Sequence, residues 1–238
     1  MLTSRSRRIC SGIKPLHPDH ARREATRRKY DAIAPDYSSR YANPTAVATR
    51  QVKMIRRWGA PLEPGASVLE VGCADGLVTE ALAAAGFVVT AVDLSPVMVE
   101  RAQERVRAAG LRATLLVGDI DTLELGKRFD AVLGVMWTFF AYASDPQRTL
   151  TRLAGHSKTK LLVDFNPRTI PLSSAIATVH AAGFSNISWR PFLVPQRHRL
   201  PAVALAGLEA AELVPGIRRI PLGLRGNAVI KAELSGQR

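Results

Sequence analysis

The sequence VLEVGCADGLVTEALAAAG, residues 68–86, combines a short apolar strand, a turn of small residues and a helix. The turn contains Gly72, Ala74 and Gly76, whose small side chains let another molecule approach the backbone closely. The helix that follows presents unpaired backbone N–H groups in its first turn. The stretch is either a ligand-binding turn or a tight connection in which the small residues serve packing alone, and one glycine turn does not distinguish the two.

Beyond this stretch, apolar runs of strand length alternate with helical patterns. Further strand patterns cover residues 88–94, 113–119, 129–136, 160–166, 186–194 and 227–234. This alternation predicts an α/β fold with a doubly wound, mostly parallel seven-stranded sheet and helices on both faces. Between the last two strands, Pro201, Pro215 and Pro221 interrupt the helical pattern. We therefore expect no full helix in residues 195–226, and a C-terminal antiparallel hairpin at the sheet edge.

The composition is that of an ordinary globular protein, with 238 residues of which 47% are hydrophobic and 22% charged. Charged residues or prolines interrupt every apolar run before it reaches the ~20 residues of a membrane helix. The chain has 2 cysteines, Cys10 and Cys73, which support neither a disulfide framework nor a metal site. We expect no metal and a reducing, cytoplasmic location. The formal net charge of +13 suits nucleic acid, an anionic membrane surface or an acidic substrate, or only a solvated basic surface.

A carboxylate follows the next strand at a spacing that suits a nucleoside. Asp93 ends the strand VVTAVDL and lies 21 positions after Gly72, where it can accept hydrogen bonds from both hydroxyls of a ribose. Asp93 could instead cap the helix that starts at Pro96, but Ser95 has the right position for that, which leaves the carboxylate for a ligand. Leu77 and Glu70 argue against a dinucleotide, because the fingerprint needs a small residue at position 77 and a second acid would repel a pyrophosphate.

Three segments in order resemble class I S-adenosylmethionine-dependent methyltransferases. EVGCADG is similar to their first motif, AVDLSPVMVERAQ to their second-strand motif and LLVGDIDTL to the segment after their third strand. The resemblance covers roughly residues 30–234 and implies a Rossmann-like fold, methyltransferase activity and S-adenosyl-L-methionine as the cofactor. It departs from the family mildly at Ala74, the central small position of the turn.

The resemblance also implies a role for each matching residue. The glycine turn would line the methionine part of the cofactor, with Glu70 supporting it from behind. Asp93 would hold the ribose, Asp119 would accept from the adenine amine, and apolar side chains would enclose the ring. The cofactor-binding residues implied in this way are Tyr30, Tyr37, Glu70, Gly72, Cys73, Ala74, Asp75, Gly76, Asp93, Leu94, Met98, Asp119, Ile120 and Val135. Read singly, Met98 and Ile120 suit the core and Asp119 suits a turn cap equally well.

Three regions follow from this interpretation. Residues 1–29 are expected to form a basic N-terminal tail and helix rather than a transit peptide, because Pro and Gly break any amphipathic pattern at the start. Residues 30–60 are expected to form an N-terminal lid and a helix. The segment KYDAIAPDYSSRYANP resembles the variable lid of small-molecule methyltransferases, in which Tyr30 and Tyr37 either close over the cofactor or pack on the domain. Residues 61–238 would form the cofactor-binding domain, with a basic and apolar insertion at about 195–225.

The acceptor is less constrained than the cofactor. His180, Asp164 and Tyr37 are candidate bases, none of them strong, so the catalytic residues remain unassigned. The segment GVMWTFFAYASD, residues 134–145, lacks the motif of methyltransferases that act on amino groups of DNA bases. We expect a small or lipid-like acceptor methylated at oxygen or carbon, with the insertion either touching a membrane surface or packing on its own sheet. The alternatives are an RNA methyltransferase and a non-catalytic protein that binds the cofactor.

Overall fold

The computed structural model describes residues 18–58, 62–135, 139–195, 198–212, 214 and 227–236. The N-terminal half contains α1 (Pro18–Ile33), η1 (Ala34–Asp36), η2 (Ser38–Arg40), α2 (Pro44–Trp58), β1 (Ser67–Val71), α3 (Leu77–Ala84), β2 (Val88–Asp93), α4 (Pro96–Ala108) and β3 (Thr114–Val117). The C-terminal half contains β4 (Phe129–Gly134), α5 (Phe139–Tyr142), α6 (Pro146–Gly155), β5 (Ser157–Phe165), α7 (Leu172–Ala181), β6 (Phe184–Phe192), α8 (Ala202–Ala211) and β7 (Asn227–Leu234).

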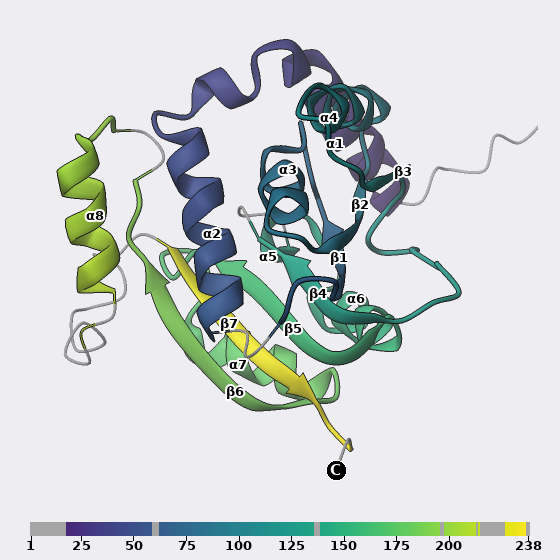
Figure 1. Cartoon of the computed structure of the whole chain (residues 1–238). Helices are drawn as coiled ribbons and strands as arrows, with labels where there is room; N and C mark the ends of the chain where they lie inside the picture. The colour runs from purple at the N-terminus through teal and green to yellow at the C-terminus, as the bar shows by residue number, and fades with distance from the viewer. Residues whose placement is uncertain are drawn as a thin grey trace, which may run out of the picture.

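These strands form one seven-stranded sheet in the order β3-β2-β1-β4-β5-β7-β6. The pairs among β1 to β5 are parallel, whereas β7 runs antiparallel to both β5 and β6 (Figure 1). The order reverses at β1, so that β2 and β3 lie on one side of it and β4 and β5 on the other. In such sheets the crevice at the carboxyl ends of the strands beside this reversal is where ligands bind.

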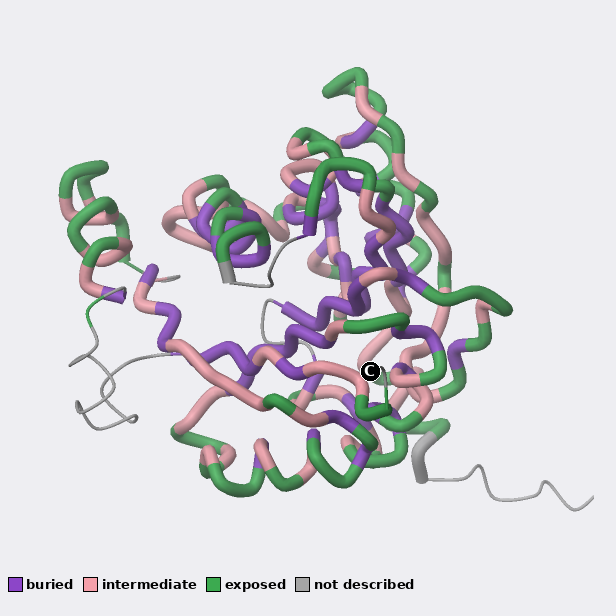
Figure 2. Tube along the Cα trace, turned by 60° about the horizontal axis from the view of Figure 1, so that its bottom comes forward, coloured by how far each residue is buried: buried purple, intermediate pink, exposed green. Residues whose placement is uncertain are grey.

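The sheet separates two hydrophobic cores. Neighbouring residues of β1 point to opposite faces, so that Val68 enters one core with α2 and α3 and Leu69 enters the other with α6 and α7. Both side chains are fully buried, as are most strand residues, while the outer turns of the helices are exposed (Figure 2). The fold is therefore a three-layer α/β sandwich, as the alternating sequence pattern predicts.

One element differs from the sequence prediction. Residues 202–211 form the helix α8, although we expected no full helix between the last two strands. Pro201 is the N-cap residue of this helix, so the proline precedes it and does not interrupt it. The alanine-rich sequence between the prolines favours a helix on its own.

None of the helices that the structure describes combines the length and the apolar character that a membrane crossing requires.

Candidate cofactor and acceptor site

The turn after β1 is held in a left-handed backbone conformation. Gly72, Ala74 and Gly76 have φ angles of 76°, 47° and 80°. Such angles are rare for alanine and mark a backbone that its surroundings must stabilise. The Asp93 carboxylate provides this support, because its Oδ2 accepts from the Ala74 backbone N–H at 2.9 Å. The turn and the end of β2 are thus joined through one carboxylate.

Asp93 is engaged more fully than the sequence suggested. Its Oδ1 accepts from the backbone N–H of Ser95 at 2.9 Å, while Ser95 caps α4 as predicted by accepting from the Met98 backbone N–H at 3.1 Å. The carboxylate is therefore not left free, although two carboxylate oxygens can accept further hydrogen bonds. Burial raises the pKa of Asp93, and the backbone N–H groups of Ser95 and Ala74 oppose that rise.

Gly76 serves helix packing. A Cβ atom at this position would lie 2.7 Å from the Cβ of Ala102 on α4. The absence of a side chain lets the start of α3 approach α4 closely, and the positive φ further favours glycine.

Glu70 lies behind the turn and below the surface. It is only 2% exposed on β1, and its Oε2 accepts from the Thr79 hydroxyl of α3 at 2.6 Å. Burial raises the pKa of Glu70 to about 8, against the opposing effect of the Thr79 hydrogen bond. The side chain is therefore largely protonated at neutral pH and joins β1 to α3.

A cavity of about 770 Å³ opens at the carboxyl ends of the strands. This volume is within the range of small-molecule sites. Eight of the predicted cofactor residues line it: Tyr30, Tyr37, Gly72, Ala74, Asp93, Leu94, Asp119 and Ile120. They come from the N-terminal segment and from the ends of β1, β2 and β3, so the fold gathers residues that are far apart in the sequence.

The other six predicted residues lie off the cavity wall, among them Glu70 and Gly76, described above. Met98 is fully buried and Val135, directly after β4, is 1% exposed. Cys73 is a buried free thiol whose pKa is raised by burial. Asp75 is bound by Arg105 and by the Ser38 hydroxyl.

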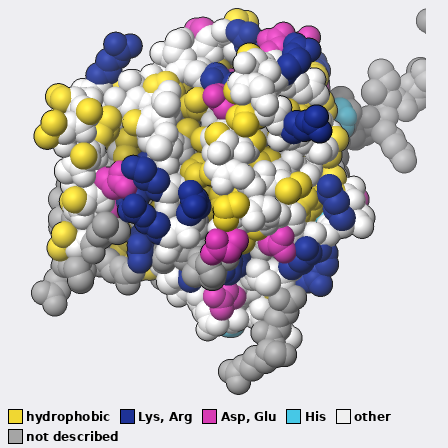
Figure 3. Space-filling model, viewed as in Figure 1, with side chains coloured by type: hydrophobic (Ala, Val, Ile, Leu, Met, Phe, Trp, Pro, Cys, Tyr) yellow, Lys and Arg dark blue, Asp and Glu magenta, His cyan; other side chains and the backbone are white. Residues whose placement is uncertain are grey.

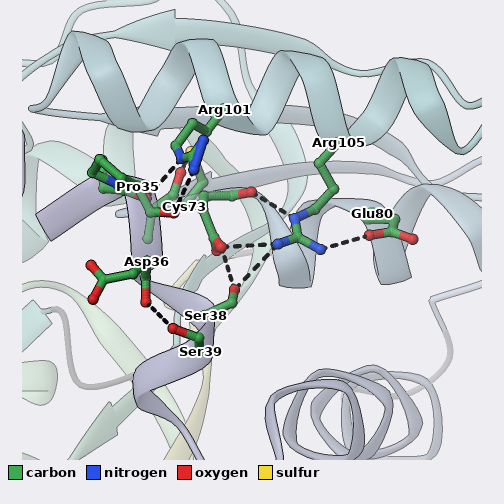
Figure 4. A network of polar contacts seen from close by, with 11 residues as sticks. Pro35, Asp36, Ser38, Ser39, Cys73, Glu80, Arg101 and Arg105 are labelled. Carbon is green, nitrogen blue, oxygen red and sulfur yellow. Dashed lines mark hydrogen bonds and ion pairs between the residues drawn. The ribbon is translucent and has the colours of Figure 1, made fainter.

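Asp75 is part of a network of polar contacts that fastens the N-terminal lid to α4. Figure 4 shows Ser38 of the lid beside Arg105 of this network, and Arg101 beside Pro35. The Arg105 guanidinium donates to the Asp75 carboxylate at 2.9 Å and to the Ser38 hydroxyl at 3.2 Å. One turn earlier, Arg101 donates to the carbonyl of Ala34 at 2.7 Å and to that of Pro35. Two arginines of one helix therefore hold residues 34–38 beside the cofactor turn.

Helix α1 contributes a cavity residue that sequence reasoning missed. Arg23 binds Asp119 with a separation of 2.9 Å and Asp121 with one of 3.4 Å, and all three line the cavity. Residues 23 and 119 are nearly a hundred positions apart, so no local pattern signals this ion pair.

All 4 tyrosines of the chain line this cavity: Tyr30, Tyr37, Tyr41 and Tyr142. Their rings form a chain, with centroid separations of 5.6 Å for 142 and 30, 6.1 Å for 30 and 37, and 5.3 Å for 37 and 41. Tyr30 is hydrogen-bonded to Tyr142, and Tyr41 donates to Tyr37 at 3.0 Å. Burial is the main cause of the strongly raised pKa values of Tyr30 and Tyr37, so both stay protonated at neutral pH.

The three candidate bases are dispersed. His180 is exposed on α7, Asp164 is buried in β5, and only Tyr37 lines the cavity. Because Tyr37 stays protonated, it can donate a hydrogen bond but is a poor proton acceptor.

The residues of the cavity suit S-adenosyl-L-methionine. Leu94 and Ile120 offer apolar contact to a flat ring, while the carboxylates of Asp93 and Asp119 are acceptors for hydroxyl and amine groups. These two carboxylates would also offset the positive charge of the cofactor's sulfonium group.

Known proteins match both the sequence and the fold. A family model described as a methyltransferase domain matches residues 68–160, from β1 into β5. The match contains all three segments whose resemblance predicts a class I S-adenosylmethionine-dependent methyltransferase. The chain is 35% identical over 127 residues to the ubiquinone biosynthesis O-methyltransferase of Xanthomonas axonopodis pv. citri, covering 51% of this chain and 52% of that protein. A magnesium-protoporphyrin O-methyltransferase of Rhodobacter capsulatus is 33% identical over 107 residues, covering 44% and 47%.

Solved structures confirm the methyltransferase fold. The magnesium protoporphyrin IX methyltransferase of Synechocystis PCC 6803 with bound SAM has a TM-score of 0.66 and 18% identity, covering 94% of this chain and 100% of that one. The [4+2]-cyclase SpnF has a TM-score of 0.63 and 19% identity, covering 88% and 94%. The two sequence relatives are matched over only about half of their length, and a cyclase shares the fold, so the reaction of the whole protein is a separate question.

Proposed function

We propose that this protein transfers a methyl group from S-adenosyl-L-methionine to a small-molecule acceptor, most simply at an oxygen atom. The observation that carries the proposal is the coincidence of the methyltransferase match over residues 68–160 with a cavity at the sheet's switch point. The named relatives support oxygen as the acceptor atom, because both are O-methyltransferases.

The cofactor-binding roles remain those of the sequence hypothesis. Asp93 would accept from the ribose hydroxyls, Asp119 from the adenine amine, and Leu94 and Ile120 would contact the ring. Asp119 can serve the adenine only if it shares its carboxylate with Arg23 or releases it, since the guanidinium lies 2.9 Å away.

The bound cofactor would supply an electrophilic methyl group on a positively charged sulfur. An acceptor oxygen would take up this methyl group through its lone pair, and the electron pair of the C–S bond would remain on sulfur, which would leave S-adenosylhomocysteine. A hydroxyl acceptor must also lose its proton, whereas an ionised oxygen need not. The chain's own residues would contribute mainly by orienting the acceptor and excluding water, which is the role of the tyrosine-rich wall.

The exposed side of α8 supports a further partner, an anionic membrane surface. The helix has no buried residue, and Val203 is 85% exposed. Its acidic residue Glu209 points instead toward Lys53 and Arg57 of α2. Figure 3 shows hydrophobic side chains along the edge that α8 forms and basic side chains beside them, a combination that favours anionic lipid. The basic residues 218 and 219 of the predicted insertion lie outside the described residues.

Methyl transfer from radiolabelled S-adenosyl-L-methionine tests the function directly. The purified chain is incubated with pools of small aromatic hydroxy compounds, with lipid extract and with RNA, and labelled product is separated by class. Label in the small-molecule pool is expected. Label only in RNA would replace the proposal with the RNA alternative. Cofactor binding without transfer to any pool would favour the non-catalytic alternative.

Membrane contact has its own test, co-sedimentation with vesicles containing phosphatidylglycerol. Val203→Asp should reduce the bound fraction, whereas the matched substitution Val88→Asp at an exposed site on β2 should not. Equal binding of both variants would contradict a role for α8.

A further inference from the structure

A second cavity, the α6 groove, lies between helix α6 and the crossover segment that joins β3 to β4. Figure 1 shows this crossover leaving β3 and returning beside α6 to enter β4. Among the described residues, none lines both the α6 groove and the cofactor cavity. The groove has a volume of about 830 Å³, which is within the range of small-molecule sites. It therefore has room for a ligand of its own.

Hydrogen bonds fix the crossover to α6 at both ends of the groove. At one end, the Asp121 carboxylate accepts from the Thr149 hydroxyl of α6. At the other end, each ring nitrogen of His156 lies within hydrogen-bonding distance of a backbone carbonyl, that of Lys127 at 3.1 Å and that of Leu123 at 3.2 Å. The fold itself therefore holds the two walls of the groove at a fixed separation.

The wall of the α6 groove carries more cations than acids. The acids that line it are Asp145 and Glu124, whereas the lysine and arginines are Lys127, Arg128, Arg148 and Arg152. Glu124 binds Arg152. Asp145 is the N-cap residue of α6 and accepts from the Arg148 backbone N–H at 3.1 Å. Both acids are thus engaged, and the balance of charge on the wall is positive.

Three of these cations have no acidic partner in the part of the chain that the structure describes. The Lys127 ammonium contacts neutral groups, the Thr90 hydroxyl at 3.3 Å and the Phe129 ring at 4.9 Å from its centre. The Arg128 guanidinium donates twice to one backbone carbonyl, at 2.9 and 2.6 Å. Arg148 is exposed, and its side chain has no partner among the described residues. An anion in the groove would therefore meet cations that are not paired with a carboxylate.

Gly155, the last residue of α6, keeps one end of the groove open. A Cβ atom at this position would have no heavy atom within 4 Å, and its φ angle is not positive, so neither packing nor backbone conformation requires glycine there. Glycine is also unfavourable in a helix. The missing side chain leaves the backbone accessible from the groove, where a ligand can approach it closely.

The unpaired cations lie toward both ends of the groove. Arg148 is in the first turn of α6, whereas the Arg128 guanidinium contacts the carbonyl of Ser157, beyond the end of the helix. The helix rises about 10 Å between positions 148 and 155, at about 1.5 Å per residue. Two groups of cations separated in this way suit two linked phosphates better than one. An arginine side chain binds phosphate through parallel N–H donors.

We propose that the α6 groove binds a soluble ligand that carries a diphosphate, with one phosphate at Arg148 and the other at Arg128 and Lys127. A lipid headgroup is a less suitable source of phosphate, because α8, the helix proposed to contact a membrane, lies on the other side of the molecule from α6 (Figure 1). Since the groove is separate from the cofactor cavity, this ligand is a further partner of the protein.

Titration of the isotope-labelled whole chain with pyrophosphate, followed by NMR, tests the site. The salt concentration is about 0.15 M, at which attraction between exposed charges is screened beyond ~8 Å. We expect saturable shifts of the Gly126 and Gly155 amides, unchanged by S-adenosylhomocysteine. Arg148→Glu should weaken binding about tenfold through loss of a charge-assisted hydrogen bond. The charge-matched control Arg112→Glu, at an exposed arginine outside the groove, should leave it unchanged.

A second variant, Gly155→Leu, changes no charge and places a side chain in the open end of the groove. Position 155 is exposed and unpacked, so this variant should fold as the wild type does. It should weaken pyrophosphate binding several-fold, and unchanged affinity would contradict binding at this end of the groove.

Four other results would overturn the proposal. Equal weakening by Arg148→Glu and Arg112→Glu would show that the overall charge of the chain attracts the anion. Loss of pyrophosphate binding on addition of S-adenosylhomocysteine would place the anion in the cofactor cavity. Absence of saturable binding would remove the site. Binding to phosphatidylglycerol vesicles that Arg148→Glu abolishes, without binding of pyrophosphate, would assign the groove to a lipid headgroup. None of these measurements depends on methyl transfer.

Discussion

At the scale of single residues, the proposed binding of the cofactor depends most on Asp93. Its carboxylate supports the strained Ala74 turn and faces the cavity. Asp93→Ala should weaken S-adenosyl-L-methionine binding by more than about 1 kcal/mol, because ribose hydroxyls lose a charged acceptor. Calorimetric titration measures this loss, with Glu104→Gln on the exposed face of α4 as the control. Unchanged affinity in Asp93→Ala would contradict the ribose assignment.

The raised pKa of the Glu70 carboxyl predicts that the stability of the fold depends on pH. Its pKa rises from 4.5 to about 8 on folding, so the folded chain binds this proton more tightly than the unfolded chain does. The stability that Glu70 contributes is complete below pH 4.5 and is lost as the pH rises toward 8. Glu70→Gln, which does not titrate, should gain about 1.4 kcal/mol of stability relative to wild type for each pH unit across that window. Urea denaturation between pH 5 and 8 measures it, and parallel curves for the two proteins would show that Glu70 is ionised in the fold.

At the scale of elements, the lid depends on α4. Arg105 binds both Asp75 and Ser38, so Arg105→Ala should speed hydrogen exchange of the backbone at residues 37–41 and weaken cofactor binding several-fold. Arg107→Ala is the matched control, because Arg107 is exposed on the same helix. Exchange that is equally slow in both variants would mean that the lid is held by its apolar contacts alone.

Helix α8 depends on a buried ion pair with α2. Arg50 binds Glu212, directly after α8, and their side chains are 7% and 2% exposed. Glu212 also accepts from the Leu193 backbone N–H at 2.6 Å. Glu212→Ala should cost about 3 kcal/mol of unfolding free energy, because it leaves the Arg50 charge buried without its main partner. Chemical denaturation measures the loss, and a change below about 1 kcal/mol would contradict this anchoring role.

The sequence predicts most of the strands and some of the helices, but not all of them. The strands follow from local periodicity, as do the helix after the glycine turn, α3, and the helix that starts at Pro96, α4. The cap of α4, Ser95, follows from the chemistry of helix capping. Helix α8 does not follow from the pattern of prolines, because Pro201 is the N-cap residue of this helix and does not interrupt it. A proline interrupts a helix only where it falls inside it.

At the scale of the whole molecule, the fold and the cavity residues that lie in the sequence motifs were predictable, whereas the cavity residues from distant segments were not. Gly72, Ala74 and Asp93 lie in consecutive motifs whose spacing identifies them. Arg23 and Arg168 reach the cavity only through the packing of α1 and the turn after β5. Their positions depend on tertiary contacts between distant segments, for which a single sequence carries no periodic signal.

The central claim is that the cavity at the switch point of the sheet binds S-adenosyl-L-methionine. Calorimetric titration of the whole chain with S-adenosyl-L-methionine, S-adenosylhomocysteine and NADH tests it most directly. We predict binding of the first two at micromolar levels or tighter, and no binding of NADH. Binding of NADH alone, or of none of the three, would contradict it.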